Sequence, residues 1–570
     1  MKIVFSFTAV IFIIMISSVY AQEPSHYDWG KFTRADSLRG FLSPLRSCYD
    51  VTYYNLDIKV DTSTKSINGS NTIMFKVVNT FDKMQVDLFA NMNVDKIVFE
   101  DGTLLKFSRE AGAVFITLPY KLEQNSTHQI IFYYSGKPQA AQRPPWDGGF
   151  IWTKDNEGNP WVEVTCQGTG ASLWWPNKDH QSDKPDSMLI NITVPKGLED
   201  ISNGRLRSKT VLPDGSIKFS WFVSYPINNY NVTVNICKYS HFSDVYTGKD
   251  GSKLTLDYYV LPGNLKKAEK QFRQVKTMQA CYEKYFGKYP FYRDGYKLIE
   301  SSHNGMEHQS AVAYGNHYLK GYKGNASSRV GLKFDFIIIH ESAHEWWGNS
   351  LTSSDIADMW IHESFAAYAE ALYVEYNWGR GASLKYMNGK KPNIKNEMPI
   401  IGPYNVNHDG SGDMYDKGQL VLNTLRDVIN DDSLWFSILK GMQEKFAYKS
   451  INADDIINYI NQKTGRNYNY FFEQYLRYVK LPVFTAYVAQ KGNETALRYK
   501  WDSDEKDFKM PIKVTTSNNH FEFIYPTTKF QSLKLKKFDP KNFKVDKEEF
   551  LCGTKIFRSY VDPRSNINIY

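Results

Sequence analysis

Between Tyr49 and about Tyr239, apolar and polar positions alternate in short runs that turn residues separate. Runs such as YYNLDIKVD, NTIMFKVVN and HQIIFYYSG place apolar side chains at every second position. Side chains that follow one another along a β-strand point to opposite faces, so this period predicts half-buried strands. Residues 22–245 are therefore expected to form an N-terminal β-rich domain of saddle or sandwich type.

The period changes after about residue 249. The segment at 264–287, NLKKAEKQFRQVKTMQACYEKYFG, has apolar positions at helical spacing and stops at Gly287. Residues 246–480 are expected to be mainly helical, with one strand-like run, YKLIESS, just before residue 303. Alternation returns in the last ninety residues, which predicts a small C-terminal β-sandwich at 481–570. The pattern indicates a multidomain α+β protein.

Composition agrees with this division. A chain of 570 residues is expected to form about three domains. The hydrophobic fraction of 42% is enough for sizeable cores. The 69 basic and 61 acidic residues are mixed and give a formal charge of +8, without an arginine-rich block. We therefore expect an ordinary solvated surface and no nucleic-acid partner.

The N-terminus has the pattern of an export signal. Lys2 precedes a run that is apolar to about Ile16, and Val19-Tyr20-Ala21 resembles a cleavage site. We expect residues 1–21 to be a signal peptide cut after Ala21, which predicts a secreted or periplasmic protein without stable membrane insertion. An uncleaved anchor is the alternative, although the apolar run is slightly short for one.

Cysteines and glycosylation triplets contribute little to the prediction of fold or function. The five cysteines are scattered, odd in number and without CxxC spacing, so they indicate neither a disulfide framework nor a cysteine metal site. One or two disulfides remain open, and their pairing cannot be deduced. Six Asn-x-Ser/Thr triplets are explained by chance at least as well as by glycosylation.

The strongest chemical signal is HESAHEWWGN at residues 340–349. On a helix, His340 and His344 lie one turn apart on one face and can bind one metal ion. Glu341 is then placed to act as a base toward water at that ion. Such a motif arises by chance only about 0.01 times in a chain of this length. The alternative is a helix that carries two unrelated histidines.

A third ligand is available nineteen residues beyond His344. Hydrolytic zinc sites use three protein ligands and keep one position open. Glu363 lies in DMWIHESFAAYAEALYVEY, a helical run whose core-facing residues include Trp360 and Phe365. Two antiparallel helices would bring Glu363 to the ion, so we expect one Zn²⁺ per chain. His362 points about 100° away from Glu363 and is expected to support the site or to be solvated.

These residues resemble a known family. HExxH, eighteen residues and then Glu is similar to the gluzincin aminopeptidases typified by aminopeptidase N. HESAHEWWGNSLT, MWIHESFA, EKYFGKYPF and MYDKGQLVL resemble further segments of that family, in its order, across most of residues 50–480. The resemblance implies a thermolysin-like catalytic domain. The large helical C-terminal domain that the family often adds is not expected here.

The family's exopeptidase motif, GxMEN, has a variant here, NGMEH. The resemblance places Glu307 where the family glutamate binds the free α-amine of the substrate, with Gly305 and Met306 beside it. Asn304 replaces the expected glycine and His308 the expected asparagine. We expect His308 to contact the substrate or to reshape the first subsite, and these changes affect substrate preference more than reaction type.

Two further residues follow from the resemblance. Tyr415, in MYDKG, matches the tyrosine that stabilises the oxyanion of the transition state. The segment VTCQGTGASLWWPNKD places Gln167 where the family has a second glutamate for the substrate amine. The alternative is that Gln167 only caps a loop.

The sequence therefore predicts a zinc aminopeptidase that removes the first residue from peptides with a free N-terminus, with Glu341 as general base. An endopeptidase on the same scaffold is one alternative, and a non-catalytic peptide-binding module is another. Neither the preferred N-terminal residue nor the oligomeric state can be deduced.

Overall fold

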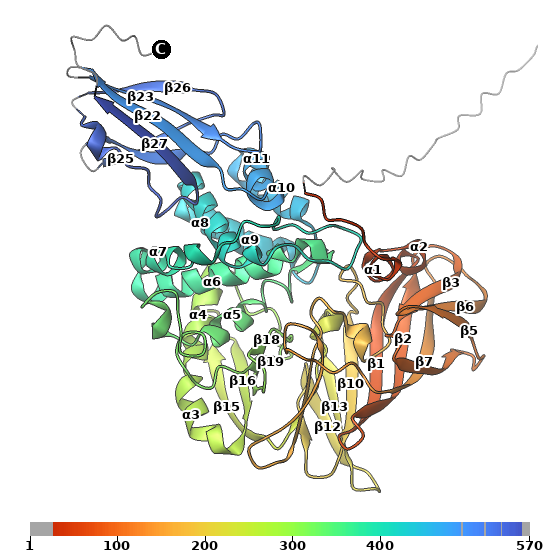
Figure 1. Cartoon of the computed structure of the whole chain (residues 1–570). Helices are drawn as coiled ribbons and strands as arrows, with labels where there is room; N and C mark the ends of the chain where they lie inside the picture. The colour runs from red at the N-terminus through yellow and green to blue at the C-terminus, as the bar shows by residue number, and fades with distance from the viewer. Residues whose placement is uncertain (1–26, 492–493, 518–519, 537, 561–570) are drawn as a thin grey trace, which may run out of the picture.

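A computed structural model describes residues 27–491, 494–517, 520–536 and 538–560. The predicted signal peptide lies outside these residues and is not tested. Figure 1 shows an N-terminal β-rich part, a middle part with a sheet and most of the helices, and a C-terminal β-rich part. The sheets of the first two parts lie side by side, with helices packed across them. Among the described residues, no helix combines the length and apolarity needed to span a bilayer.

The N-terminal part is built from three sheets, as the alternation predicts. Its largest sheet has seven strands in the order β12-β13-β10-β1-β2-β7-β4. Most of its strands bury one face, whereas the edge strand β12 has no buried residue. Along β1 the buried positions include Tyr54, Leu56, Ile58 and Val60. The strands of this sheet are β1 (Tyr49–Asp61), β2 (Ser66–Val77), β4 (Met92–Phe99), β7 (Thr127–Gly136), β10 (Ser187–Val194), β12 (Arg205–Val211) and β13 (Ile217–Val223).

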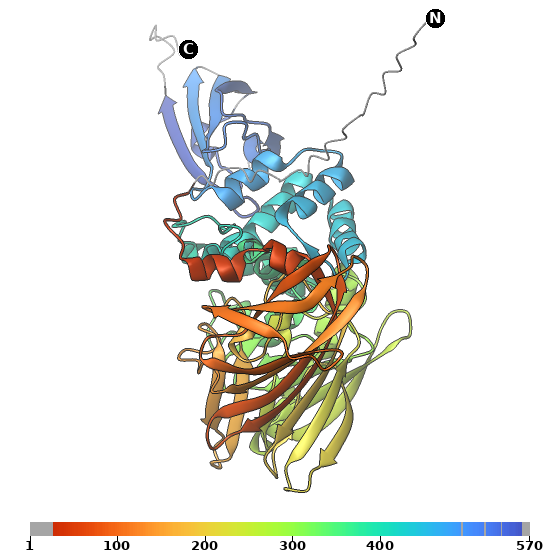
Figure 2. The same cartoon turned by 90° about the vertical axis from the view of Figure 1, so that its right-hand side faces the viewer.

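Two smaller sheets complete this part, in the orders β3-β6-β5 and β11-β14-β9-β8. The second of them carries Gln167 just beyond the end of β9. Two short helices precede the sheets; Figure 2 shows them in red from the side. The first of them contacts the loop at 403–410, where the backbone N–H of Asn407 donates to the carbonyl of Asp36 at 3.1 Å. These elements are α1 (Arg34–Gly40), α2 (Pro44–Ser47), β3 (Phe81–Asp87), β5 (Lys106–Glu110), β6 (Ala113–Leu122), β8 (Gly149–Lys154), β9 (Pro160–Thr165), β11 (Glu199–Asp200) and β14 (Asn235–Cys237).

The middle part begins earlier than residue 246. Strand β15 (Ser240–Thr247) pairs with β16 (Lys253–Val260), not with the N-terminal sheets. The five-stranded sheet runs β15-β16-β17-β19-β18, so the short β18 forms its edge. The run YKLIESS forms a strand, as expected. The remaining strands are β17 (Tyr296–Glu300), β18 (Gly305–Met306) and β19 (Val312–Tyr314).

Helices cover this sheet and continue beyond it. The segment at 264–287 forms two helices instead of one, and Gly287 ends the second with a φ of 99°. A large apolar core joins sheet and helices, and it includes Trp346, Trp347, Trp360 and Trp435. The helices are α3 (Leu265–Gln271), α4 (Gln274–Tyr285), α5 (Phe336–Ala343), α6 (Trp360–Trp378), α7 (Arg380–Asn388), α8 (Asp416–Ile429), α9 (Asp432–Phe446), α10 (Ala453–Thr464) and α11 (Asn469–Phe472).

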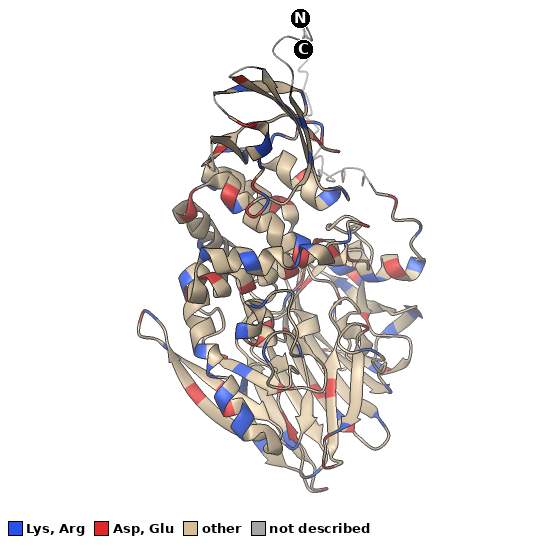
Figure 3. Cartoon of the chain, turned by 60° about the vertical axis from the view of Figure 1, so that its left-hand side comes forward, with Lys and Arg blue, Asp and Glu red and all other residues tan. Residues whose placement is uncertain are grey.

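The C-terminal part is a four-stranded sheet, β26-β23-β22-β27, with a two-stranded ribbon, β24-β25. All five cysteines are buried and free, so none of the disulfides left open by the sequence is formed. Acidic and basic residues are interspersed over the whole chain (Figure 3). The strands are β22 (Val483–Lys491), β23 (Glu494–Asp502), β24 (Ile512–Ser517), β25 (His520–Ile524), β26 (Gln531–Lys536) and β27 (Gly553–Tyr560).

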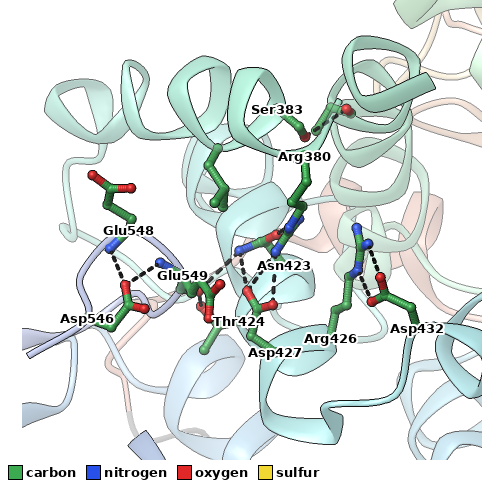
Figure 4. A network of polar contacts seen from close by, with 12 residues as sticks. Arg380, Ser383, Asn423, Thr424, Arg426, Asp427, Asp432, Asp546, Glu548 and Glu549 are labelled. Atoms are coloured by element: carbon green, nitrogen blue, oxygen red, sulfur yellow. Dashed lines mark hydrogen bonds and ion pairs between the residues drawn. The ribbon is translucent and has the colours of Figure 1, made fainter. Parts of the chain in front are cut away.

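The C-terminal part is attached directly to helix α8. The side chain of Asn423 donates to the carbonyl of Glu549 at 3.1 Å (Figure 4). The hydroxyl of Thr424 accepts from the backbone N–H of Leu551 at 2.9 Å. A bidentate ion pair between Arg380 and Asp427 joins α7 to the same helix. Because α8 begins one residue after Tyr415, these contacts fix the helix that directly follows this residue.

Candidate metal centre and active site

Helix α5 places two histidines side by side. Three consecutive isoleucines, residues 337–339, anchor the helix in the core. His340 and His344 follow with ring centroids 5.0 Å apart. His344 is the first residue after α5, yet its backbone is still helical, with φ −62° and ψ −20°. The one-turn spacing expected from the sequence is therefore present.

Helix α6 packs against α5 and brings Glu363 to the histidines. The Glu363 Oε2 atom lies 3.5 Å from His340 Nε2 and 3.4 Å from His344 Nε2. All three side chains are almost fully buried. The core-facing residues of α6, among them Trp360 and Phe365, are 1% exposed, as the helical pattern predicts.

The three side chains fit a zinc ion. His344 Nε2 and Glu363 Oε2 are buried and have no hydrogen-bond partner, although they face each other. Two imidazoles and one carboxylate are the donor set of hydrolytic zinc sites, and their donor atoms converge within 4.8 Å. Burial alone would lower the pKa of His344, but the Glu363 and Glu307 carboxylates outweigh it and raise this pKa to about 9. The site therefore favours a cation.

A second layer of side chains orients the histidines. His340 Nδ1 donates to Glu370 Oε1 at 2.7 Å, and His344 Nδ1 donates to the carbonyl of Trp347 at 2.9 Å. These bonds turn both Nε2 atoms toward Glu363. Glu370 in turn accepts from Lys390 at 2.6 Å and from Tyr386 at 2.5 Å. Glu370 was not singled out from the sequence, although it lies two helical turns beyond Glu363.

Glu341 faces the same cavity. Its side chain is close to the backbone of Gly305, where an added Cβ would lie 2.8 Å from Glu341 Oε1. The glycine of the NGMEH motif therefore makes room for this carboxylate. Burial raises the pKa of Glu341 to about 7, with His340 opposing the shift. A carboxyl with a pKa near neutrality is suited to proton transfer.

Glu307 forms a separate carboxylate site beside the three ligands. Its Oε1 atom accepts from Gln167 Nε2 at 2.5 Å and from the hydroxyl of Tyr230 at 3.2 Å. Gln167 also donates to Glu363 Oε1 at 3.2 Å. Gln167 is therefore more than a loop cap, because it joins the two carboxylates. No sequence pattern distinguished Tyr230 from the other 38 tyrosines.

The structure places His308 elsewhere than expected. Gly305, Met306 and Glu307 line the cavity, but His308 is fully buried and is absent from its walls. Burial lowers the pKa of this imidazole to about 3, and His303 adds to the shift. His308 therefore forms no part of the cavity wall in this structure. Asn304, the other departure from the family motif, lines the cavity and donates to the hydroxyl of Tyr322.

His362 is not solvated. Its ring is fully buried, and its Nε2 atom accepts the backbone N–H of Ser353 at 2.9 Å. Nδ1 lies 3.5 Å from the hydroxyl of Tyr230, which bonds Glu307. Burial lowers the pKa of His362 to about 3. This histidine therefore supports the walls of the site as a neutral ring.

Tyr415 lies next to the candidate ligands. Its ring stacks on that of His340 with centroids 6.0 Å apart, and it lines the cavity. Burial and then the Glu363 carboxylate raise its pKa well above the ordinary value, so the phenol keeps its proton. A protonated phenol can donate a hydrogen bond to a developing negative charge.

The three candidate ligands line one cavity of about 500 Å³, together with Glu341, Glu307, Gln167 and Tyr415. A cavity of this size holds a small molecule or the end of a peptide chain. It lies between the N-terminal sheets and the helices, because Gln167 comes from the former and α5 and α6 from the latter. The structure thus brings together each of the predicted site residues except His308.

Comparisons with known proteins agree with this geometry. Residues 271–475 match the peptidase family M1 domain. Endoplasmic reticulum aminopeptidase 1 of Mus musculus is 22% identical over 477 residues, which cover 78% of this chain and 48% of that protein. Leucyl aminopeptidase of Saccharolobus solfataricus is 23% identical over 321 residues, 53% of this chain and 39% of that protein. The chain spans about half the length, or less, of these curated relatives.

Solved structures share the fold. An M1 zinc metallopeptidase mutant from Deinococcus radiodurans, bound to a Tyr-Ser-Ala substrate, superposes with a TM-score of 0.63 at 17% identity. The match covers 78% of this chain and 96% of that one. Another crystal structure of the same enzyme gives a TM-score of 0.64 at 19% identity. The chain thus shares the fold of these M1 metallopeptidase structures, and its residues 271–475, which contain the three candidate zinc ligands, match the peptidase family M1 domain.

Proposed function

We propose that this protein is a zinc-dependent aminopeptidase that removes the N-terminal residue from peptides. The observation that carries the proposal is a second carboxylate site, Glu307 with Gln167 and Tyr230, next to the three candidate zinc ligands in one cavity. A carboxylate that is 2% exposed is costly unless a cation pairs with it. The α-ammonium of a peptide is such a cation, and it would set the first peptide bond beside the metal site.

His340, His344 and Glu363 would hold the zinc ion. When bound, zinc supplies Lewis acidity that polarises a carbonyl group and makes water more acidic. Glu341 takes a proton from water and passes it to the leaving amine, for which its raised pKa suits it. Tyr415 donates a hydrogen bond to the oxygen on which negative charge develops.

The edge of the sheet offers a place for the substrate backbone. Strand β18 ends the five-stranded sheet and pairs only with β19 among the described strands. Its outer side can pair with an extended peptide that enters the cavity. The ammonium at Glu307 then limits the reach of the peptide to one residue before the cleaved bond.

We also propose that the protein is exported to the periplasm or secreted. The apolar N-terminal run with the small residues before position 22 supports this proposal. N-terminal sequencing of protein purified from its native host tests it. A chain that begins at Gln22 is expected, and a chain that retains Met1 would contradict it.

The catalytic proposal is tested with metal analysis and one chromogenic aminoacyl substrate. The purified chain is expected to hold one zinc per molecule and to lose activity with a chelator and regain it with zinc. Glu341→Gln should keep the zinc and lose turnover by a factor of about 10² to 10⁴. An exposed matched control, Glu269→Gln on α3, should behave like the wild type. Full turnover by the Glu341→Gln variant would contradict the proposed mechanism.

A further inference from the structure

The cavity has one wall that the reaction itself does not use. This wall surrounds Gly168, the residue after Gln167. Because Gln167 bonds Glu307, the wall lies beside the place proposed for the substrate amine. The side chain of the first substrate residue begins one bond away from that amine. The residues around Gly168 are therefore candidates for the subsite that receives it.

Trp146 forms one side of this wall. It is 68% exposed, whereas the other exposed tryptophan of the described chain, Trp378, is 37% exposed. Its loop is rigid, because the Asp147 carboxylate accepts the backbone N–H groups of Gln142 and Arg143 at 2.6 and 2.7 Å. The loop is also fixed to the Gly168 segment, since the hydroxyl of Thr169 donates to the carbonyl of Asp147 at 3.1 Å. A large aromatic ring is thus held at the cavity.

Asp409 belongs to a second loop at this wall. That loop is joined to the same segment, because the side chain of Asn407 donates to the carbonyl of Gly168 at 3.2 Å. The aromatic segment before α1 holds this loop from outside: the ring of His408 lies 5.4 Å from that of Trp29 and 5.8 Å from that of Phe32. Asp409 itself lines the cavity.

The Asp409 carboxylate has no partner among the side chains of the described residues: no ion pair or hydrogen bond from them reaches it. The Asp409 side chain is exposed where it lines the cavity. Its carboxylate is therefore open to a cationic group of a bound substrate, with which it can form a charged hydrogen bond.

Other residues that line the cavity are also compatible with such a subsite. Ile356 and Met359 line the same cavity and offer apolar surface to a substrate side chain. Five residues that line the cavity carry carboxylates and one, Lys390, carries an ammonium. Lys390 is already paired with Glu370 at 2.6 Å and with Asp416 at 3.4 Å, so it does not neutralise Asp409.

From this wall we infer that the first subsite selects an N-terminal arginine or lysine, with Asp409 as the residue that determines specificity. The inference rests on the proposed function, because it assumes that Glu307 holds the amine. A long basic side chain lays its methylene groups along Ile356 and Met359 and the face of Trp146, and brings its charge to Asp409. The ion pair supplies the discrimination, since a charged hydrogen bond contributes about ten- to hundredfold in affinity.

The test uses two substrates that differ only in charge. Arginine and citrulline have nearly the same shape, but citrulline is neutral. With fluorogenic arginyl and citrullinyl substrates, the zinc-loaded full chain is expected to favour arginine in kcat/KM by about ten- to hundredfold. Asp409→Asn should reduce that ratio to about one by lowering the arginine rate. The exposed control Asp504→Asn should keep the wild-type ratio.

Trp146 is tested separately. Trp146→Ala should raise KM for both substrates, and Trp146→Phe should restore most of the loss because it keeps an aromatic face. A wild-type ratio near one, or a ratio that Asp409→Asn leaves unchanged, would overturn the inference while leaving the aminopeptidase proposal intact.

A binding measurement makes the test independent of catalytic turnover. In the Glu341→Gln chain loaded with zinc, calorimetry compares L-argininamide with L-citrullinamide. Tighter binding of argininamide that Asp409→Asn abolishes supports the inference. If the wild-type chain shows this binding but hydrolyses no substrate, the proposed function fails and the inferred subsite stands. Equal binding of the two amides refutes the subsite.

Discussion

The bond between His340 and Glu370 offers a direct test of how the metal site is oriented. The Glu370 carboxylate receives three donors: His340 Nδ1 at 2.7 Å, Lys390 at 2.6 Å and the hydroxyl of Tyr386 at 2.5 Å. It is 1% exposed. Glu370→Gln keeps the shape of the side chain but removes its charge and one acceptor oxygen. Glu370→Ala removes the acceptor altogether.

The expected effect follows from this geometry. Loss of an outer partner of a histidine ligand weakens metal affinity by about 10- to 100-fold, or about 1.4 to 2.7 kcal/mol. Gln can still accept one hydrogen bond from His340, so it should lie near the lower limit. Ala leaves His340 Nδ1 and Lys390 without this partner and should reach or exceed the upper limit.

Zinc affinity is measured by competition with a chelator of known affinity on the full chain, with circular dichroism as the check on folding. Glu269→Gln, an exposed change on α3, is the matched control. The order of affinity should be wild type, then Gln, then Ala. Folded variants that both bind zinc within about twofold of the wild type would refute the argument that Glu370 orients His340.

Three further predictions concern other groups. Tyr415→Phe should lower kcat by about 10² to 10³, the effect of losing one oxyanion donor, and an unchanged kcat would exclude that role. Glu307→Ala should lower kcat/KM for aminoacyl substrates by at least tenfold, because the ammonium loses its buried partner; equal values would exclude amine binding. Burial lowers the pKa of His180 and of His308 to about 3 and that of His303 to about 4. Since the unfolded chain then binds more protons at these histidines, their contribution to stability should be complete above about pH 6.5 and be lost progressively toward pH 4. A wild-type urea midpoint that falls no more between these pH values than that of a His180→Gln variant would contradict the assignment.

Much of the fold could be predicted because its periodicity is local. Alternation along β1 and the helical spacing in α6 reflect which face each element buries. The metal ligands were predictable for the same reason: His340 and His344 are one helical turn apart, and Glu363 lies on the next long helix. The spacing of residues along a helix or strand determines which side chains share a face, so such a pattern can be converted directly into relative positions.

The rest of the site depends on contacts between distant segments. Gln167 meets Glu307 across 140 positions, and Tyr230 meets it across 77. Such contacts leave no periodic signal, and only the family resemblance pointed to Gln167. Lys390 and Tyr386 likewise reach Glu370 from a neighbouring helix and the turn that follows it.

His308 illustrates a limit of motif comparison. Gly305, Met306 and Glu307 all line the cavity, whereas His308, the next residue, is fully buried and is not part of the lining. Residues 307 and 308 follow strand β18 and have no regular secondary structure, so no periodic pattern indicates the direction of the His308 side chain.

The central claim is that Glu307 and the metal site together restrict cleavage to the first residue. It is tested most directly by incubating the zinc-loaded chain with one peptide in two forms, with a free and with an acetylated N-terminus, and following products by mass spectrometry. The account predicts stepwise loss of N-terminal residues from the free peptide and none from the acetylated one. Cleavage of the acetylated peptide, or internal cleavage of either form, would contradict it.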